Sequence, residues 1–512
     1  MIKKYLFLLF ITISIHSQTF QWVDFPTVNY SIGQTNGYPT CCDNLGNVYF
    51  VGIKDNQFNS SNIYGNLFYR KYNSSGSLLY EKIIGGKVRS FNLKSDSLGN
   101  IYLVAAFKTS ISFDSGAAIN TSETSEVPIL IKFDSNGTFL WNVTISNIGS
   151  FNHFNAIDID SNNDIYIGID NFNNSRIVKL SATNGSVLSS ILQQNVQIIS
   201  SVSVDNLGNI YASGSCGKTT STFAGVAQPT SLSYSIYAVK YNSLGVHQWT
   251  KYIEDISCLD PEISVKSPND VYLSSSLSGA FSFGSLTSQG PPSGFSDDIF
   301  ITKLDANGNF QWVREVDGNG KASVGNGHFL TSDNSGNVYF AGNTKSTTVW
   351  SPSFTTTVTG FGSDALFLKY NSNGDLQIVK KAGGTSSDTF ESIALDNLGT
   401  IYITGKATNT VSFDGITNIV GSNVPFISKI SSTLNNNSFT NENFIVYPNP
   451  SNNEFYISNV SEKTKGEIYD AVGKKIKSFE VDSLTPININ EIASGIYFIK
   501  LANNRVRKFI KQ

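Results

Sequence analysis

A seven-residue motif that recurs along the chain does most to limit the folds open to it. The clearest copy is Asp205-Asn206-Leu207-Gly208-Asn209-Ile210-Tyr211. The Asp carboxylate can accept hydrogen bonds from amides two residues on, and the Gly can adopt the left-handed conformation that closes a short turn. The alternating run that follows is typical of a half-buried strand. Copies begin at Asp43, Asp96, Asp160, Asp205, Lys266, Asp333 and Asp396.

A second hairpin motif alternates with the first. It consists of a Lys, an apolar residue and Asx-x-x-Gly, as in Lys132-Phe133-Asp134-Ser135-Asn136-Gly137, and related copies begin at Lys71, Lys179, Lys240, Lys303, Lys369 and Lys429. Two hairpins in each repeat give four antiparallel strands, which is the content of one propeller blade. The sequence therefore predicts an all-β fold with a seven-bladed β-propeller over residues 18–434. We interpret the recurring Lys as a structural partner for a carboxylate or carbonyl group.

The two ends of the repeat region complement one another. Phe20-Gln21-Trp22-Val23 copies Phe310-Gln311-Trp312-Val313, a strand that elsewhere follows the Lys hairpin. The last repeat stops after Lys429-Ile430-Ser431 and lacks this fourth strand. We therefore predict that the N-terminal strand completes the last blade and closes the ring, which leaves no large exposed sheet edge.

The first residues have the features of a secretory signal peptide, which we assign to residues 1–17. Lys3 and Lys4 precede the apolar run Tyr5–Ile15, and cleavage is expected just before Gln18. The run is too short to span a bilayer, and no later segment reaches ~20 apolar residues, so we expect no transmembrane segment. The mature protein is expected to be exported.

The composition changes near the end of the chain. Residues 435–443 form a polar linker, and residues 444–512 hold 10 Lys and Arg against 7 Asp and Glu, whereas residues 5–443 hold 24 against 32. The strand pattern of the tail predicts a small Ig-like antiparallel β-sandwich. The acidic repeat region argues against nucleic acid as a partner, because nucleic acid needs a basic footprint.

Both parts of the chain are similar to known bacterial families. The Asp-x-x-Gly-Asn-x-Tyr and Lys-x-Asp-x-x-Gly signatures resemble the SBBP-type seven-bladed β-propeller repeat, which implies no single activity. The tail resembles the type A C-terminal sorting domain of the type IX secretion system in Tyr447-Pro448-Asn449-Pro450, Gly495-Ile496-Tyr497 and Lys508-Phe509-Ile510-Lys511. This second resemblance implies that the type IX machinery recognises residues 444–512. It also implies export, either into the medium or to the outer-membrane surface.

Few residues indicate catalysis. His153 and His328 lie near the expected starts of innermost strands; a site at the mouth of the ring is one interpretation, and ordinary polar lining is the one we favour. Asp160, Asn162 and Asp164 begin a calcium-loop spacing, but the Gly and the distal Glu are missing. No nucleophile–base pair or phosphate loop stands out. We predict no catalytic residue, no metal site and no cofactor.

The loops between the second and third strands, together with the crossings between blades, form the predicted ligand face. The repeat Tyr and the following Lys are separated by 13 to 31 residues, whereas the Asx-Gly turns hardly vary, and recognition usually uses variable loops on a rigid scaffold. The alternative is that the aromatic residues are packing, which for Trp350 is favoured by the similar positions of Phe113, Phe223, Phe283 and Phe413. The predicted site consists of Phe283, Phe295, Trp350, Phe354, Phe361, Asp297, Asp298 and Asp364.

The variable face is also expected to carry a disulfide. Cys216 follows a second strand, and Cys258 lies in the crossing to the next blade, so both belong to this face in adjacent blades. We predict that they pair in the exported protein. Whether Cys41 and Cys42 are free or paired stays open.

The function favoured by these patterns is an exported binding or adhesion module for an extracellular glycan or protein. The alternative is a secreted glycan-degrading or other hydrolytic enzyme that uses carboxylates on the variable face. The scarcity of His and the lack of a non-repeated acidic cluster favour binding over catalysis.

Overall fold

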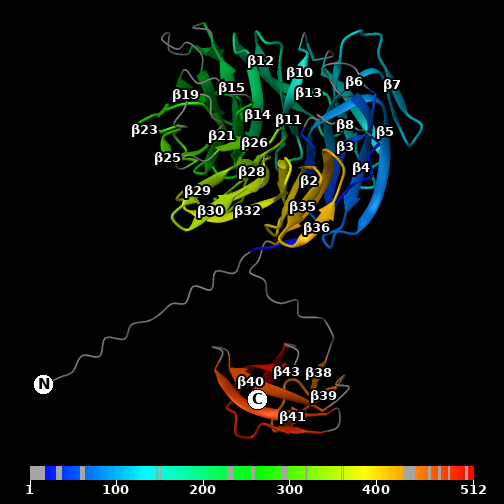
Figure 1. The fold of residues 1–512 in the computed structure, drawn as a ribbon, viewed down its shortest axis with the longest axis vertical. Coiled ribbons are helices and arrows are strands. Elements are labelled where there is room, and N and C mark those ends of the chain that lie inside the picture. Colours follow the sequence, from blue (N-terminus) through cyan, green and yellow to red (C-terminus); the bar gives the residue numbers. More distant parts are fainter. Residues whose placement is uncertain are drawn as a thin grey trace, which may run out of the picture. The chain divides into compact units, whose positions relative to one another are not determined.

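The protein is described by a computed structural model that covers residues 18–512, except for sixteen short segments. The chain divides into a larger compact unit, Gln18–Ser432, and a smaller one that contains Thr433–Gln512. Figure 1 shows the larger unit in blue to yellow-orange and the smaller one in deeper orange to red. The segments outside the described residues are 30–36, 58–63, 146–147, 150, 218–219, 228–234, 255–259, 291–297, 317–320, 359, 361, 432–443, 459–462, 471–473, 483–484 and 502–505.

Four-stranded antiparallel repeats build the larger unit, as the two hairpin motifs predicted. We number the repeats in chain order, starting from β2. Repeat 1 has β2 (Thr40–Cys42), β3 (Val48–Gln57), β4 (Tyr64–Tyr72) and the first part of β5 (Leu78–Ser95). Repeat 2 has the rest of β5, then β6 (Ile101–Phe113), β8 (Val127–Phe133) and β9 (Phe139–Thr144). Repeat 3 has β10 (His153–Ile159), β11 (Ile165–Asp170), β12 (Ser175–Leu180) and β13 (Val187–Gln194).

The later repeats follow the same order. Repeat 4 has β14 (Ile198–Val204), β15 (Ile210–Cys216), β18 (Ser235–Tyr241) and β19 (His247–Glu254). Repeat 5 has β20 (Glu262–Val265), β21 (Val271–Leu277), β24 (Asp298–Leu304) and β25 (Phe310–Glu315). In repeat 6 the first strand is split into β26 (Lys321–Val324) and β27 (Leu330–Ser332), followed by β28 (Val338–Lys345), β31 (Asp364–Tyr370) and β32 (Leu376–Gly384). Repeat 7 has β33 (Thr389–Leu395), β34 (Ile401–Ala407), β37 (Val424–Ile430) and β1 (Phe20–Asp24).

The recurring Asp holds the turn between the first and second strands. In repeat 4, Asp205 Oδ1 accepts hydrogen bonds from the amides of Leu207 and Asn209, both at 2.9 Å. Its second oxygen accepts one from the Tyr211 hydroxyl, also at 2.9 Å. Gly208 has a φ of 78°, in the left-handed region that its missing side chain permits. Most hydrogen-bonding groups of the motif are therefore bonded within its own turn.

In most repeats the recurring Lys bonds to the next repeat, whereas Lys179 pairs with Asp160 and Asp164 of its own repeat. Lys132 Nζ donates to the carbonyl oxygen of Ala182 at 2.7 Å, and the Trp141 indole donates to the same oxygen at 3.3 Å. Lys303 and Trp312 share the carbonyl of Ser372 in the same way, at 3.0 and 3.1 Å. This is the structural role that the sequence predicted for the Lys.

The first strands of the repeats lie next to one another in a cycle. β5 contacts β2 and β10, β14 contacts β10 and β20, and β27 contacts β20 and β33. β33 in turn contacts β2, so the last repeat lies beside the first. At this junction β1 pairs antiparallel with β37, for example Trp22 with Lys429. The first strands therefore surround the middle of the larger unit.

The smaller unit consists of two antiparallel sheets. One contains β38 (Ile445–Tyr447), β39 (Glu454–Ser458) and β42 (Ile487–Asn488). The other has the order β41 (Lys475–Val481), β40 (Thr464–Asp470), β43 (Gly495–Leu501) and β44 (Val506–Lys511). Phe455, Ile468, Ile499 and Phe509 are buried together in its core.

Candidate binding cavity inside the ring of first strands

Two aromatic residues of the predicted ligand site, Phe283 and Trp350, are packed inside the protein. Phe283 is 0% exposed, with its ring 5.1 Å from Phe300 and 5.7 Å from Phe310. Trp350 is 7% exposed, and its indole donates to Thr356 Oγ1 at 2.9 Å. Phe354 is half-buried against the same core. Phe283 and Trp350 therefore do not present the apolar contact area that the sequence argument assigned to them.

The reason is that the variable loops fold back as short hairpins. Phe283 ends β22 (Ser282–Phe283), which pairs with β23 (Leu286–Thr287), and Trp350 lies in β29 (Thr347–Ser351), which pairs with β30 (Phe354–Thr357). Related hairpins begin with β16 (Thr222–Phe223), which pairs with β13, and β35 (Thr410–Phe413), which pairs with β32. The hairpins of β16 and β35 therefore each add strands to the outer edge of the preceding repeat's sheet. The packing alternative accounts for Phe283 and Trp350.

Two carboxylates of the predicted site, Asp298 and Asp364, are buried too. Asp298 Oδ1 accepts hydrogen bonds from the amides of Ile299 at 2.6 Å and Val316 at 3.1 Å, and its side chain is not available to a ligand. Asp364 is 1% exposed and pairs with Lys381 at 2.5 Å. Phe295, Asp297, Phe361 and Cys258 lie outside the described residues, so their assigned roles, including the Cys216–Cys258 disulfide, stay predictions.

A cavity of about 710 Å³ lies inside the ring of first strands. These strands run toward the Asx-Gly turns, and the lining residues cluster near their beginnings. The cavity is therefore at the end of the ring away from the turns, on the side of the variable loops. Its lining comes from repeats 2 to 7 and includes Arg89, Phe91, Asn92, Glu126, Asn152, His153, Phe154, Ser200, Asp260, Glu262, Ser276, Ser323, Asn326, Phe329 and Lys406.

β-Bulges in the first strands shape this lining. Ile199 pairs with Gly214 and Ser201 with Ser213, which leaves Ser200 as an extra residue. Such bulges bend a strand and change the direction of a side chain. A Cβ on Gly214 would lie 2.1 Å from the carbonyl oxygen of Ile198, so the bulge requires Gly there.

Repeat 6 carries a much larger bulge. Val324 pairs with Gly342 and Leu330 with Phe340, so residues 325–329 stand opposite Ala341 alone. This loop lines the cavity through Gly325, Asn326, Gly327 and Phe329. Its His328 bonds through Nδ1 to Glu262 Oε1 of repeat 5 at 3.2 Å.

Most charged groups around the cavity have a partner of opposite charge. Arg89 Nε lies 2.6 Å from Glu126 Oε1, and Lys406 Nζ lies 3.2 Å from Glu391 Oε1. His153 Nδ1 lies 3.0 Å from Asp170 Oδ2. Burial disfavours the imidazolium of His153, but the hydrogen bond and the charge of Asp170 outweigh it and raise the pKa of His153. Burial raises the pKa of Asp260, and the nearby Glu262 and Asp170 carboxylates add to this effect.

The rest of the lining combines uncharged polar groups with aromatic rings. Asn92, Asn152 and Asn326 bring amide groups, and Phe91, Phe154 and Phe329 bring aromatic rings. The Ser200 hydroxyl is buried and has no hydrogen-bond partner within the described part of the chain. Buried polar groups normally have a partner, so this hydroxyl is a candidate contact for a ligand.

The sequence predicted that His153 and His328 lie near the mouth of the ring, and it favoured ordinary polar lining over a binding site there. The structure brings His153 into the cavity lining and His328 into the loop beside it. A signal that points to the cavity was present in the repeat. Gly214, Gly342 and Gly405 each lie three residues after the recurring Tyr, and each faces the close-lying backbone of a first strand.

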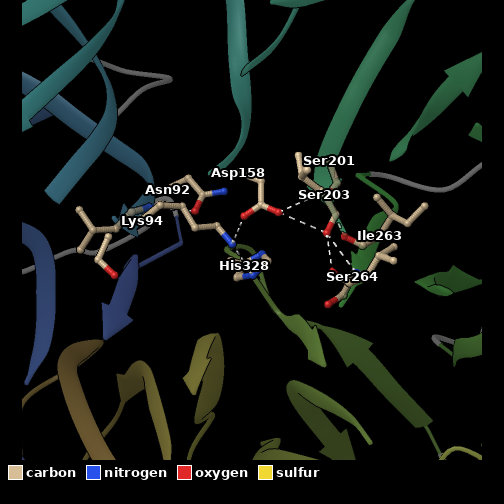
Figure 2. Close-up of polar contacts among 12 residues, drawn as sticks. Asn92, Lys94, Asp158, Ser201, Ser203, Ile263, Ser264 and His328 are labelled. Carbon is tan, nitrogen blue, oxygen red and sulfur yellow. Dashed lines mark hydrogen bonds and ion pairs between the residues drawn. The ribbon is translucent and has the colours of Figure 1, made fainter. Parts of the chain in front are cut away.

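Toward the turns, a second layer of polar residues lies below the cavity. Figure 2 shows Lys94, Asp158, Ser203, Ser264 and His328 directed into the space between the first strands. Lys94 Nζ lies 3.6 Å from Asp158 Oδ1 and 3.4 Å from His328 Nε2. Asp158 Oδ2 accepts hydrogen bonds from the Ser203 hydroxyl at 3.3 Å and the Val204 amide at 2.8 Å.

Comparison with protein families decides the nature of the smaller unit. Residues 445–512 match the model of the secretion system C-terminal sorting domain. The smaller unit is a sorting domain. A sorting domain of this kind indicates a secreted or cell-surface protein and an interaction with the secretion machinery, as the tail motifs implied. The search of curated proteins gave no match to the sequence.

Among solved structures the chain is similar to several propellers. The Dos1 propeller shares 9% identity at a TM-score of 0.40, covering 82% of this chain and 97% of that one. The β-propeller domain of the Trilobed protease from Pyrococcus furiosus shares 8% identity at a TM-score of 0.40, covering 76% and 99%. The WD40 domain of Toxoplasma gondii coronin shares 10% identity at a TM-score of 0.41, covering 83% and 90%. These similarities concern the fold alone.

Among the residues that the structure describes, no helix is long and apolar enough to cross a bilayer. No group of three or more His, Cys, Asp or Glu side chains among them is arranged to hold a metal ion.

Proposed function

We propose that the larger unit is a seven-bladed β-propeller of the SBBP type, closed by β1, and that the sorting domain is an Ig-like sandwich read by the type IX machinery. The cycle of first strands and the pairing of β1 with β37 support the closed ring. The two facing sheets of the smaller unit support the sandwich. The propeller is then the cargo, and the sorting domain is its export signal.

The exported cargo is a binding or adhesion module whose ligand occupies the central cavity. The observation that carries this proposal is the cavity itself, which is built from several repeats and has a volume of about 710 Å³. Small-molecule sites typically measure about 300–1,000 Å³ and combine apolar surface with a few polar groups. The aromatic rings and amide groups of this lining fit that description.

The favoured ligand is an uncharged glycan. Arg89, Lys406 and His153 are each paired with a carboxylate, so the cavity has little free charge to offer an ion. Its amides and the Ser200 hydroxyl can instead exchange hydrogen bonds with sugar hydroxyls. The Phe rings can cover the apolar face of a sugar.

The test is a glycan array of neutral gluco-, manno-, xylo- and galacto-oligosaccharides, probed with the mature chain. Asn326→Trp fills the cavity from an exposed lining position. Asn206→Trp makes the same exchange at an exposed position in an Asx-Gly turn, on the opposite end of the ring. We expect Asn326→Trp to weaken binding at least tenfold and Asn206→Trp to leave it unchanged. Equal binding by both variants would contradict the cavity as the site.

A second candidate is a hydrolase, and the raised pKa of Asp260 favours it. A carboxyl group with a raised pKa keeps its proton to higher pH than an ordinary carboxyl group, which favours a role as general acid. Asp260 lies in the same cavity as Glu262 and His153. A reducing-sugar assay on the same oligosaccharides distinguishes a hydrolase from a binding module, because a binding module leaves the oligosaccharides intact. Turnover by the wild-type chain that is lost in Asp260→Asn would establish the enzyme.

A further inference from the structure

The central cavity has a polar floor formed by side chains that precede the Asx-Gly turns. Lys94 and Asp158 each lie two residues before the recurring Asp of their repeat, and Ser332 lies one residue before it. The cavity residues of the same strands, such as Asn92 and His153, lie further from the turns. Because the first strands all run toward the turns, the floor residues lie deeper in the ring than the lining.

The floor is continuous across five repeats. From Lys94 and Asp158 it passes to Ser203, whose hydroxyl accepts a hydrogen bond from the Val265 amide at 3.1 Å. The next link joins Ser264 Oγ to Ser332 Oγ at 2.9 Å. The Lys94–His328 contact then returns from repeat 2 to repeat 6 (Figure 2). These contacts, joined along the backbone at residues 264–265 and 328–332, therefore span repeats 2 to 6.

The loop of residues 325–329 covers the side of the ring that lies toward repeats 1 and 7. Gly327 N donates to the carbonyl of Glu391 at 3.1 Å, and Ile393 N donates to the carbonyl of His328 at 2.8 Å. A Cβ on Gly37 would lie 2.9 Å from Gly327 Cα, so the loop is in close backbone contact with repeat 1 as well. The loop and the polar floor together occupy the ring below the cavity.

We propose that the central cavity is a blind pocket that receives the end of a glycan chain rather than an internal stretch of it. This inference rests on the proposed function. A chain threaded through the ring would have to separate Lys94 from Asp158 and His328, and it would leave charged groups without partners in a confined space. Separating such pairs is costly. A chain end needs only the one opening and leaves the floor intact.

If only chain ends bind, the number of protein molecules bound to one glycan chain does not depend on the length of that chain. The probes are linear xylan, mannan and β-glucan and the hexasaccharide of each, and the readout is the number of mature protein chains per glycan chain at saturation. Sedimentation and titration calorimetry both measure this number. We expect one protein per glycan chain for the hexasaccharide and for the polymer. A number that rises with polymer length would overturn end recognition while leaving glycan binding in place.

Variants that fill the cavity test whether the glycan binding measured in this experiment occurs in the pocket. Asn326→Trp should abolish binding at both lengths, and Ser276→Trp, at a second lining position, replaces it if the first variant does not fold. Asn206→Trp is the matched control. Binding that survives both cavity variants, or no binding of any probe by the wild-type chain, would contradict the proposed function and end recognition with it.

Discussion

Lys429 donates a hydrogen bond from Nζ to the carbonyl oxygen of Ser74 at 2.7 Å and thereby joins the last repeat to the first. Lys132 and Lys303 make the same contact between consecutive repeats. Trp22 of β1 covers Gly76 in this junction, where a Cβ would lie 2.7 Å from the indole. The two ends of the repeat region thus meet through the contact that links neighbouring repeats.

The N-terminal strand should therefore contribute to the stability of the whole larger unit. Trp22→Ala removes an indole that stacks 5.9 Å from the Tyr72 ring. Because Trp22 is half-buried, we expect the free energy of unfolding to fall by about 1–3 kcal/mol, below the usual cost in a full core. Urea denaturation of the mature chain measures this, with the exposed neighbour Gln21→Ala as control. Equal stability of the two variants would show that β1 does not close the ring.

The turns could be predicted because they depend on residues close in sequence, and the junctions between repeats because the same motif recurs along the chain. Asp205 and Tyr211 are six residues apart, and their hydrogen bond follows from the turn that lies between them. The pairing of β1 was predictable because Trp22 repeats the position of Trp312 in the motif. Local chemistry and repetition were sufficient for these features.

The site could not be predicted in the same way. The position of Trp350 in a variable loop suggested exposure, but whether such a loop projects or folds back depends on contacts with strands distant in sequence. The cavity likewise combines residues from Arg89 to Lys406, and its shape depends on bulges such as the one at Ser200. In the sequence, the cavity was marked by the Gly positions opposite the bulges and by His153, for which we favoured ordinary polar lining over a site.

The stability of the larger unit should fall as the pH rises from acidic to neutral. Burial raises the pKa of Asp298 and of Asp388 to about 7, and the pKa of His153 is raised by Asp170 against the effect of burial. All three groups bind protons more tightly in the folded than in the unfolded chain. The stabilising contributions of Asp298 and Asp388 are lost as the pH rises from about 4 to about 7. The contribution of His153 is lost as the pH rises through its pKa in the folded chain.

Asp298→Asn tests this pH dependence. An amide oxygen can still accept the hydrogen bonds from Ile299 and Val316, but the group no longer ionises. We expect the melting temperature of the wild-type chain to drop between pH 5 and pH 8, and the drop to be smaller in the variant by roughly 2–5 °C. Identical drops in both proteins would contradict the assignment to Asp298.

The disulfide between Cys216 and Cys258 is a prediction for the exported protein. Cys216 is 1% exposed, and burial raises the pKa of its thiol to about 12, so in the reduced form it would be a poor nucleophile. Peptide mapping of the secreted protein without reduction should recover the two residues in one linked peptide. Recovery of both as separate alkylated peptides would refute the bridge.

Export should depend on the sorting domain and not on the stability of the larger unit. Phe509 is fully buried, and its ring lies 4.7 Å from that of Phe455. Phe509→Ala should cost the small domain about 3–5 kcal/mol and stop delivery to the surface or medium. Cell fractionation measures delivery, with the exposed Lys474→Ala, outside the three tail motifs, as control. Normal delivery of the Phe509 variant would argue against the sorting domain as the export signal.

The most direct test of the cavity as the ligand site is hydrogen–deuterium exchange of the mature chain, with and without a saturating amount of the array's best glycan. We predict slower exchange in peptides that cover residues 89–92, 152–154 and 321–329, and no change in the hairpin of Trp350 and Phe354. Slower exchange confined to that hairpin or to the Asx-Gly turns would place the ligand elsewhere and refute the cavity as the site.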